Sequence, residues 1–293
     1  MATLSHRVEY LLARVGIGLA NLLPAALSDR AGAALGRAAA VLLRKRRRIA
    51  HDNLEKALGD QLTGTEQERV VVDVFANIGR TLFELARFRK LTPESIRRIV
   101  VPDGLEVIDA ALADGKGAII VVPHFGNWEL AGAYLAMSGY PVDVLVTTQH
   151  NSLVDAVLTS LREGAGIGII RVGRTVRHVF GALKQNRVIA IAADQHAPAA
   201  ELVTEFFGRP AAAARGPALF AIRCGAPILP FCMRRERHDR HVIMPGPAIY
   251  PPREQDEESA IRSMTEQYLR FFESCIRAYP AQWMWTHRRW KLD

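Results

Sequence analysis

A histidine and a carboxylate lie five residues apart in the segment His124-Phe125-Gly126-Asn127-Trp128-Glu129. On one continuous helix, five residues rotate two side chains about 140° apart, so a regular helix would not pair them. We expect Gly126 to turn the chain and Asn127 to cap the next helix, which brings Glu129 in its first turn back towards the imidazole. A histidine oriented by a carboxylate can remove a proton from a hydroxyl group. The spacing therefore predicts a general-base pair, although a strand-end histidine can also be purely structural.

Other kinds of catalytic site find less support in the sequence. No serine or cysteine occupies a nucleophile-elbow motif such as GxSxG, which favours direct attack by a hydroxyl substrate over a covalent enzyme intermediate. His150, His178 and His196 lack the spacing of HExxH or a similar metal motif. The three cysteines form no CxxC pair, so neither a thiolate metal site nor a disulfide framework is indicated. We expect no metal and a reducing compartment.

The elements that position this segment follow from the distribution of apolar residues. Before residue 90 the spacing is mostly helical, as in the stretch 65–89. After Pro102, short apolar runs alternate with helical segments, and they cover residues 117–122, 142–147, 168–172, 188–193, 227–232 and 242–244. Runs that are apolar on both faces indicate buried parallel strands. The fold class predicted is α/β, with a mainly parallel central sheet covered by helices on both faces and a last helix over residues 257–278.

In open α/β sheets the ligand crevice lies beyond the carboxyl ends of the strands, where this chain has His124, residues 148–151 and Asp194-Gln195-His196. We expect Asp194 to end its strand on the same sheet edge as His124. An Ala-rich stretch, residues 198–214, is interpreted as a long loop that contains Phe206-Phe207-Gly208.

The N-terminal part combines an apolar stretch with basic residues. Residues 10–27 are apolar but interrupted by Arg14, Asn21 and Pro24, and five consecutive basic residues, 44–48, follow the apolar run 38–43. With a net charge of +8, this pattern favours an anionic membrane surface over nucleic acid, for which no binding module is present. We expect residues 1–48 to be a helical membrane-associating region, monotopic rather than spanning, and residues 49–293 to form a single α/β domain. A cleavable signal peptide is disfavoured.

Several ordered blocks of the chain resemble the lipid A late acyltransferase family, whose members acylate Kdo-lipid A, and the related phosphatidylinositol mannoside acyltransferases. The blocks are Arg47-Arg48-Ile49-Ala50 with Asn53-Leu54, the segment 124–129, Asp194-Gln195, Phe206-Phe207-Gly208, Gly225-Ala226-Pro227 and the stretch 285–291. The family's His-x4-acid motif maps onto His124 as base and Glu129 as its partner. The resemblance implies attack by an acceptor hydroxyl on an acyl thioester of acyl carrier protein or coenzyme A, with no cofactor besides that co-substrate.

Further site residues carry over from the resemblance or from position. Asn151 and Arg162 match the family's polar and basic residues after the second strand and the motif helix, although Arg162 could instead only complement a helix dipole. Arg162 or Arg215 would meet the phosphates of an acceptor lipid. Phe206 and Phe207 could line an acyl pocket or pack in the core.

The function expected is acyl transfer to a hydroxyl or hydroxyacyl group of a glycolipid such as a lipid A precursor, at the cytoplasmic face of the bacterial inner membrane. The acceptor could also be a phosphatidylinositol mannoside or another glycolipid or aminolipid. Two alternatives belong to other classes: a non-catalytic lipid-surface binding protein and a metal-dependent hydrolase.

Overall fold

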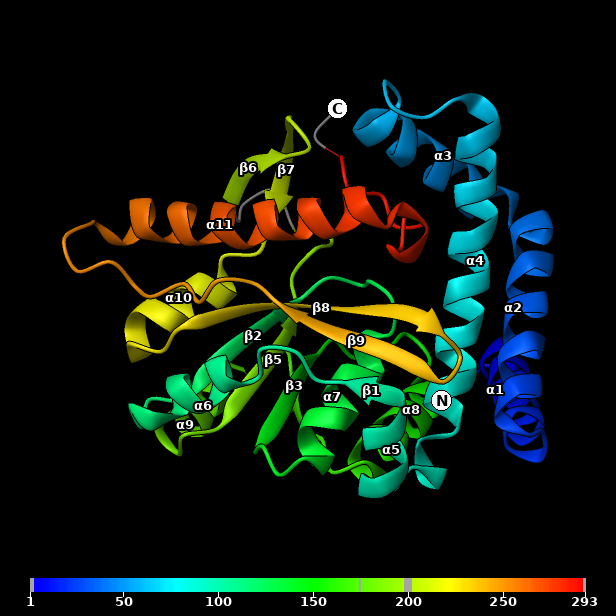
Figure 1. Ribbon diagram of the computed structural model, residues 1–293, viewed down its shortest axis with the longest axis horizontal. Coiled ribbons are helices and arrows are strands. Elements are labelled where there is room, and N and C mark those ends of the chain that lie inside the picture. The colour runs from blue at the N-terminus through cyan, green and yellow to red at the C-terminus, as the bar shows by residue number, and fades with distance from the viewer. Residues whose placement is uncertain (1–2, 174, 198–201, 292–293) are drawn as a thin grey trace.

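A mainly parallel β-sheet lies at the centre of the computed structural model, which describes residues 3–173, 175–197 and 202–291 (Figure 1). Its seven strands follow the order β1-β9-β8-β2-β5-β3-β4. Strands β8 and β9 pair antiparallel, whereas the other neighbouring strands pair parallel. The strands are β1 (Val100–Val101), β2 (Ala118–Val122), β3 (Val142–Val146), β4 (Gly168–Arg171), β5 (Val188–Ala192), β8 (Ile228–Arg237) and β9 (Arg240–Pro245).

Helices cover both faces of this sheet, as the apolar runs predicted. In β2, Ile119 and Val121 face one core, whereas Ala118 and Ile120 face the other. The first core is shared with α9 (Thr175–Lys184), α10 (Gly216–Cys224) and α11 (Glu257–Ala278). The second is shared with α5 (Pro93–Ile99), α6 (Glu106–Ala113), α7 (Trp128–Met137) and α8 (Ser152–Gly164). The α/β fold class is confirmed, because burial on both faces requires the apolar strands that the sequence shows.

The first four helices are α1 (Leu4–Leu22), α2 (Ala25–Leu42), α3 (Arg44–Leu58) and α4 (Gly64–Ala86), and the short helix η1 (Phe88–Lys90) and α5 follow them before the sheet begins. Glycines allow α2 to approach α4 closely. A Cβ atom on Gly36 would lie 2.1 Å from the Phe75 carbonyl oxygen, and one on Gly79 would lie 2.1 Å from that of Gly32. Helix α2, which lies within residues 1–48, therefore packs directly on α4, which lies outside that region. A domain boundary at residue 48 stays a prediction.

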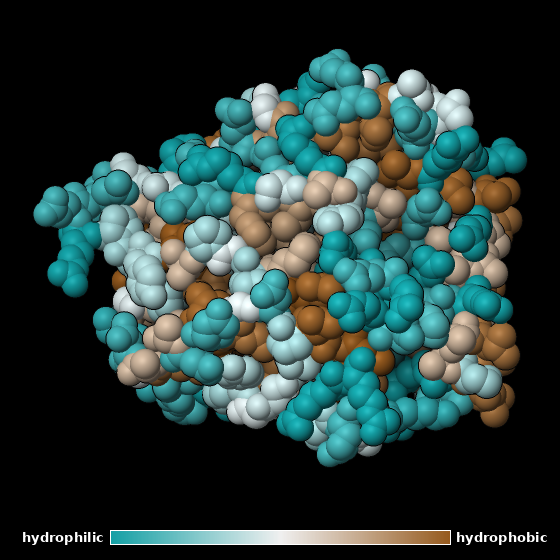
Figure 2. All heavy atoms as spheres, in the orientation of Figure 1, coloured by the Kyte–Doolittle hydropathy of each residue, from teal (hydrophilic) through white to brown (hydrophobic). Residues whose placement is uncertain are grey.

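The outer faces of α1 and α2 expose large apolar side chains. Leu22 is 85% exposed and both Leu4 and Leu42 are 78% exposed, far above what a packed helix face shows. Figure 2 shows brown apolar surface along the right-hand edge, where these helices lie. Among the residues that the structure describes, no helix is both long and apolar enough to cross a membrane.

The Ala-rich stretch that we interpreted as a loop contains a β-hairpin, so that prediction is corrected for its described part. Strands β6 (Leu202–Phe206) and β7 (Arg209–Ala213) pair antiparallel, while residues 198–201 lie outside the described residues. Leu202, Thr204 and Phe206 are buried, and Val203 and Glu205 alternate with them outwards. This alternation is typical of a strand with one buried face, and α11 packs against β6.

Candidate active site

The segment that joins β2 to α7 forms the turn that its sequence predicts. Gly126 has φ +58°, and a Cβ atom there would lie 1.7 Å from the Met233 carbonyl oxygen, so only glycine fits. Asn127 caps α7, because its side-chain oxygen accepts a hydrogen bond from the Leu130 N–H at 3.0 Å. Glu129 consequently lies in the first turn of α7.

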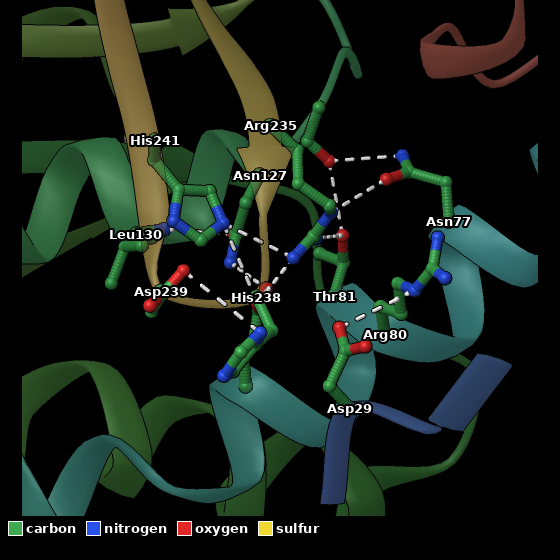
Figure 3. A network of polar contacts seen from close by, with 12 residues as sticks. Asp29, Asn77, Arg80, Thr81, Asn127, Leu130, Arg235, His238, Asp239 and His241 are labelled. Atoms are coloured by element: carbon green, nitrogen blue, oxygen red, sulfur yellow. Dashed lines mark hydrogen bonds and ion pairs between the residues drawn. The ribbon is translucent and has the colours of Figure 1, made fainter. Parts of the chain in front are cut away.

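A buried polar network holds this turn against α4 and β8 (Figure 3). The Gly126 carbonyl accepts hydrogen bonds from Asn77 Nδ2 at 3.1 Å and from Thr81 Oγ1 at 3.0 Å. Arg235 of β8 donates to Asn77 at 2.9 Å and to Thr81 at 3.1 Å, and it forms an ion pair with Glu84. Each polar group that positions the turn is therefore itself held by another one.

Glu84 stays ionised at the centre of this network. Burial would raise its pKa, but the charges and hydrogen bonds of Arg235 and His241 outweigh burial and lower the pKa to about 2. The side-chain amide of Asn127 also donates to this carboxylate at 2.5 Å. The cap of α7 is thus linked to a fixed buried charge.

The carboxylate that contacts the His124 imidazole is Asp194, directly after β5. His124 Nδ1 lies 2.7 Å from Asp194 Oδ1. Asp194 Oδ2 accepts the His124 backbone N–H at 2.9 Å and the Trp283 indole N–H at 2.7 Å. We expected Glu129 to orient the ring, and this pairing is corrected. Strands β2 and β5 are parallel neighbours, so their carboxyl ends lie side by side. Asp194, just after β5, therefore lies next to the imidazole of His124, just after β2.

The charges of His124 and Asp194 favour each other. Burial lowers the pKa of His124, but the charge and hydrogen bond of Asp194 outweigh it, so the pKa lies above its usual value. Burial likewise raises the pKa of Asp194, and the contacts with His124 and Trp283 reverse this and hold that pKa low. Asp194 is therefore a carboxylate, which fixes a proton on His124 Nδ1 and leaves Nε2 free to accept another.

Glu129 binds Arg162 of α8. Arg162 Nε lies 2.9 Å from Oε2 of Glu129, and Nη2 lies 2.6 Å from Oε1, which is a bidentate pair. Burial lowers the pKa of Arg162, but these contacts outweigh it and raise the pKa above its usual value. Arg162, at the end of α8, thus reaches the motif helix. Glu129 acts on His124 through its charge, which also raises the histidine pKa.

A cavity of about 270 Å³ brings these groups together beyond the carboxyl ends of β2, β3 and β5. Its polar lining includes His124, Glu129, Arg162 and Gln195. The remaining lining is largely apolar and includes Val122, Trp128, Leu135, Val146, Ile167 and Phe231. This position is the one expected for ligand binding in an open α/β sheet. The cavity can hold an apolar chain with its polar end at His124.

The other candidate residues separate into those near the cavity and those away from it. Gln195 Nε2 lies 3.4 Å from His124 Nδ1 and 3.5 Å from its Nε2, at the long limit of a hydrogen bond. Asn151 caps α8 and donates to Glu9 at 2.8 Å, so it ties α8 to α1. Arg215 pairs with Glu258 on α11 and is not among the residues that line the cavity.

Phe206 and Phe207 pack in an aromatic cluster with tryptophans of the C-terminal segment. Phe206 is fully buried, and its ring centroid lies 5.7 Å from that of Trp283. Phe207 contacts Trp285 and Trp290 in the same way. Neither residue lines the 270 Å³ cavity. Both side chains therefore pack in the core and do not line this cavity.

Trp283, which supports Asp194, was not among the residues predicted from the sequence. It follows the short helix η2 (Pro280–Gln282), and this segment pairs with the motif: the Met284 N–H donates to the His124 carbonyl at 3.0 Å, and the Gly126 N–H donates to that of Gln282 at 2.9 Å. The only sequence signal was the density of Trp and Arg in residues 283–291. Within the described residues, no group of three His, Cys, Asp or Glu side chains is placed to hold a metal ion.

Comparison with known proteins gives one consistent result. A family model described as bacterial lipid A biosynthesis acyltransferase matches residues 2–292. Lipid A biosynthesis lauroyltransferase of Escherichia coli is 28% identical over 97% of this chain and 92% of its own, and the palmitoleoyltransferase of that organism is 27% identical over the same shares. Phosphatidylinositol mannoside acyltransferase of Mycobacterium tuberculosis is 29% identical over 76% of this chain and 69% of its own.

Proposed function

This chain belongs to the bacterial lipid A biosynthesis acyltransferase family, and we propose that it transfers a fatty acyl group from a thioester to a hydroxyl of a glycolipid such as a lipid A precursor. The enzyme class and the general role in lipid A or glycolipid biosynthesis follow from the family. One observation supports the chemistry in particular: His124, fixed by Asp194 at 2.7 Å, lines a mainly apolar cavity at the carboxyl ends of three strands.

The proposed reaction needs no covalent enzyme intermediate. The acceptor hydroxyl gives its proton to His124 Nε2 while its oxygen attacks the thioester carbonyl carbon. The tetrahedral intermediate then collapses, the carbon–sulfur bond breaks, and the imidazolium returns the proton to the departing thiolate. Asp194 stabilises the imidazolium during these steps, because its carboxylate contacts Nδ1.

Glu129 and Arg162 have a supporting role in this proposal. Their bidentate pair places a fixed carboxylate and a fixed guanidinium on the cavity wall. The carboxylate adds to the negative charge that favours the imidazolium. The guanidinium, and the backbone N–H groups in the first turn of α7, supply donors for the oxygen that becomes negative in the intermediate.

The acyl chain occupies the apolar part of the cavity in this proposal. Its walls come from α7, α8 and the ends of β2, β3 and β5, so a chain bound there would extend away from His124 between the sheet and the helices. Burial of each methylene contributes about 0.8 kcal/mol, which makes the chain the main source of donor affinity. The thioester carrier is acyl carrier protein or coenzyme A.

We place the enzyme at the cytoplasmic face of the bacterial inner membrane, held by the exposed apolar faces of α1 and α2. An aqueous monomer rarely leaves a row of leucines at more than half exposure on two successive helices. The alternative acceptor is a phosphatidylinositol mannoside, which the similarity to the mycobacterial enzyme supports.

The decisive experiment is acyl transfer by purified protein. Lauroyl and myristoyl donors, on acyl carrier protein and on coenzyme A, are offered with a lipid A precursor and with a phosphatidylinositol mannoside. We expect transfer to one acceptor, and a loss of about 10²–10⁴-fold in His124→Ala because proton removal is lost. Glu129→Ala should lose most of its activity too, and the double variant should be little worse than either single variant.

Two controls make the result specific. His178→Ala removes a histidine of α9 that is not in the described lining of the cavity and should keep full activity. Circular dichroism and vesicle binding show that each variant folds. Full activity of His124→Ala would refute the mechanism. A folded protein that binds vesicles but transfers to no acceptor would favour a non-catalytic lipid-binding role.

A further inference from the structure

Two adjoining basic hollows lie between the first turn of α3 and the C-terminal segment. Their volumes are about 310 and 370 Å³, and both are lined by Lys45, Ile49 and Arg288. We call them together the basic groove. Its cations are Arg44, Lys45, Arg46 and Arg48 of α3 and Arg288 and Lys291 of the C-terminal segment, and all six are exposed.

Buried hydrogen bonds hold the two sides of the basic groove together. Asn53 Nδ2 donates to the carbonyls of Trp285 at 2.7 Å and His287 at 2.6 Å, and Asn53 is 2% exposed. Arg46 also donates to the Thr286 carbonyl at 3.4 Å. Figure 1 shows the C-terminal segment beside α3, although the two are separated by more than 200 residues. The shape of the groove is therefore fixed by the fold.

The positive charge of the basic groove is not neutralised by the protein. None of its lining residues is acidic, and none of its six cations forms an ion pair with a described carboxylate. Four of the cations lie in the first turns of α3, where the helix dipole opposes positive charge. By contrast, Arg162 pairs with Glu129 and Arg215 pairs with Glu258. The two arginines that we first considered for phosphate binding are already occupied.

The basic groove adjoins both the active-site turn and an apolar surface. Met284 is hydrogen bonded to the His124 carbonyl, and only two residues later Thr286 contacts Arg46. On its other side, Val41, Leu42 and Leu43 directly precede the cations and are each more than half exposed. A ligand that joins an anionic headgroup to apolar chains matches this arrangement.

We propose that the basic groove binds the phosphate groups of the acceptor's headgroup and so presents the acceptor to His124. This rests on the proposed function, and it names the surface that recognises the acceptor. The adjacent leucines favour a lipid over a water-soluble acidic protein. The size and fixed walls of the hollows favour one headgroup over diffuse contact with an anionic bilayer.

The first test measures binding without an acyl donor. Neutral phosphatidylcholine vesicles are doped with phosphorylated lipid A precursor, with the same lipid after phosphatase treatment, or with phosphatidylglycerol at equal charge. The variant Lys45→Gln/Arg288→Gln removes one cation from each side of the groove. Because each cation near a phosphate contributes about fivefold in affinity, we expect roughly 25-fold weaker binding to the phosphorylated lipid and little change for the dephosphorylated one.

A matched control comes from a separate hollow of about 440 Å³, which lies between α9 and α10 and is also lined by lysines. Its Lys116 precedes β2, at the end of the strand opposite to His124, and Lys184 is also exposed. Lys116→Gln/Lys184→Gln removes the same net charge and should bind like the wild-type protein. An equal loss in this control, or an equal loss of the groove variant on phosphatidylglycerol vesicles, would overturn the proposal.

The second test is kinetic and uses neutral detergent micelles. The groove variant should raise KM for the phosphorylated acceptor by a similar factor and leave kcat and the KM for donor unchanged. A raised KM for donor on carrier protein, with the acceptor unaffected, would show that the groove binds the carrier and would overturn the proposal. If the wild-type protein transfers to no acceptor, the binding test still decides about the groove, so the two proposals fail separately.

Discussion

In the proposed mechanism, the Asp194 carboxylate determines which nitrogen of His124 acts as the base. It accepts hydrogen bonds from the ring, from the His124 backbone and from the Trp283 indole. With all three donors in place the carboxylate cannot rotate away, and the imidazole keeps Nδ1 protonated. A base whose tautomer is fixed in advance needs no reorganisation when the hydroxyl arrives.

Asp194→Asn should lower activity and shift its pH dependence. His124 acts as a base only when neutral, and Asp194 raises its pKa above the usual value, so the acid limb of kcat/KM should lie above pH 6.5. Without the carboxylate this pKa falls, and the acid limb should move to lower pH. The plateau should drop about 10²–10⁴-fold because the imidazolium is no longer stabilised. A pH profile of the purified variant measures both effects.

A variant of the supporting indole separates positioning from folding. Trp283→Phe keeps most of the packing but removes the hydrogen bond to Asp194, so it should lower kcat less than Asp194→Asn does. An unchanged acid limb in Asp194→Asn would mean that this carboxylate does not set the pKa of the base.

Sequence reasoning predicted the local geometry of segment 124–129, but the carboxylate that contacts the His124 ring is Asp194 and not Glu129. The turn at Gly126, the Asn127 cap and the place of Glu129 depend on neighbouring residues, so local rules predict them. Asp194 meets His124 across 70 residues, and the contact depends on β2 and β5 being neighbours in the sheet. The position of Asp194 at a strand end was a usable signal. The density of Trp and Arg around Trp283 did not indicate a partner for it, because its contact with Asp194 depends on how the C-terminal segment folds back.

Helices α4 and α7 and strand β8 pack around one buried ion pair, which holds the turn of the candidate active site in place. Arg235 is 6% exposed and Glu84 is 17% exposed at the side chain, and their partners include the residues that hold Gly126 and Asn127. Removal of one partner from such a pair leaves an uncompensated charge in the interior, which costs far more than the pair itself contributes.

Arg235→Met should therefore destabilise the protein by about 3–5 kcal/mol, measured by urea unfolding. Glu84→Gln in the same chain should recover part of this loss. The pKa of Glu84 is lowered to about 2 in the folded state, so its stabilising effect is complete above its ordinary value near 4.5 and is lost as the pH falls towards 2. The acid sensitivity of the wild-type protein in this range should weaken in the variant that lacks Glu84.

A half-exposed ion pair provides the comparison. Arg223→Met breaks the contact between α10 and Glu257 of α11, where both side chains are about half exposed. It should cost less than about 1 kcal/mol because solvent screens the charges. If Arg235→Met costs no more than Arg223→Met, the buried network does not support the turn as described.

Strands and helices could be predicted where their buried positions are apolar and recur with the period of the element. Strands β2, β3, β4, β5, β8 and β9 coincide with the apolar runs. Most residues of β2, β5 and β8 are buried, whereas β3, β4 and β9 are buried in part. The hairpin β6–β7 was missed because Ala211, Ala212 and Ala213 are small and have low strand propensity. Ala211 and Ala213 are buried there in the core that also contains Phe206 and Trp283, which is a tertiary effect.

The exposed apolar side chains of α1 and α2 and the basic groove are separate parts of the molecular surface. The exposed residues Val41, Leu42 and Leu43, at the end of α2, adjoin the basic groove at the start of α3, and the C-terminal segment connects that groove to His124. A membrane that contacts this end of α2 would therefore bring lipid headgroups to the basic groove. In the proposed function, membrane contact would therefore be part of acceptor capture.

Leu11→Ser/Leu12→Ser should accordingly weaken binding to phosphatidylcholine–phosphatidylglycerol vesicles without unfolding the protein. Both leucines are more than 60% exposed on α1, so their loss removes apolar area that only a membrane or a partner would bury. If both leucines insert into the membrane interface, their loss should lower the partition coefficient between vesicles and water by about tenfold or more.

Val176→Ser/Val203→Ser removes two apolar side chains that are 53% and 44% exposed, from α9 and β6, and should leave vesicle binding intact. Transfer assays then connect the surface to the reaction. In vesicles the α1 variant should lose activity in parallel with binding, whereas in detergent micelles with dispersed acceptor it should approach the wild-type rate, because His124 and its cavity are unchanged. Equal activity of the two double variants in vesicles would show that the leucines of α1 do not deliver the enzyme to its acceptor.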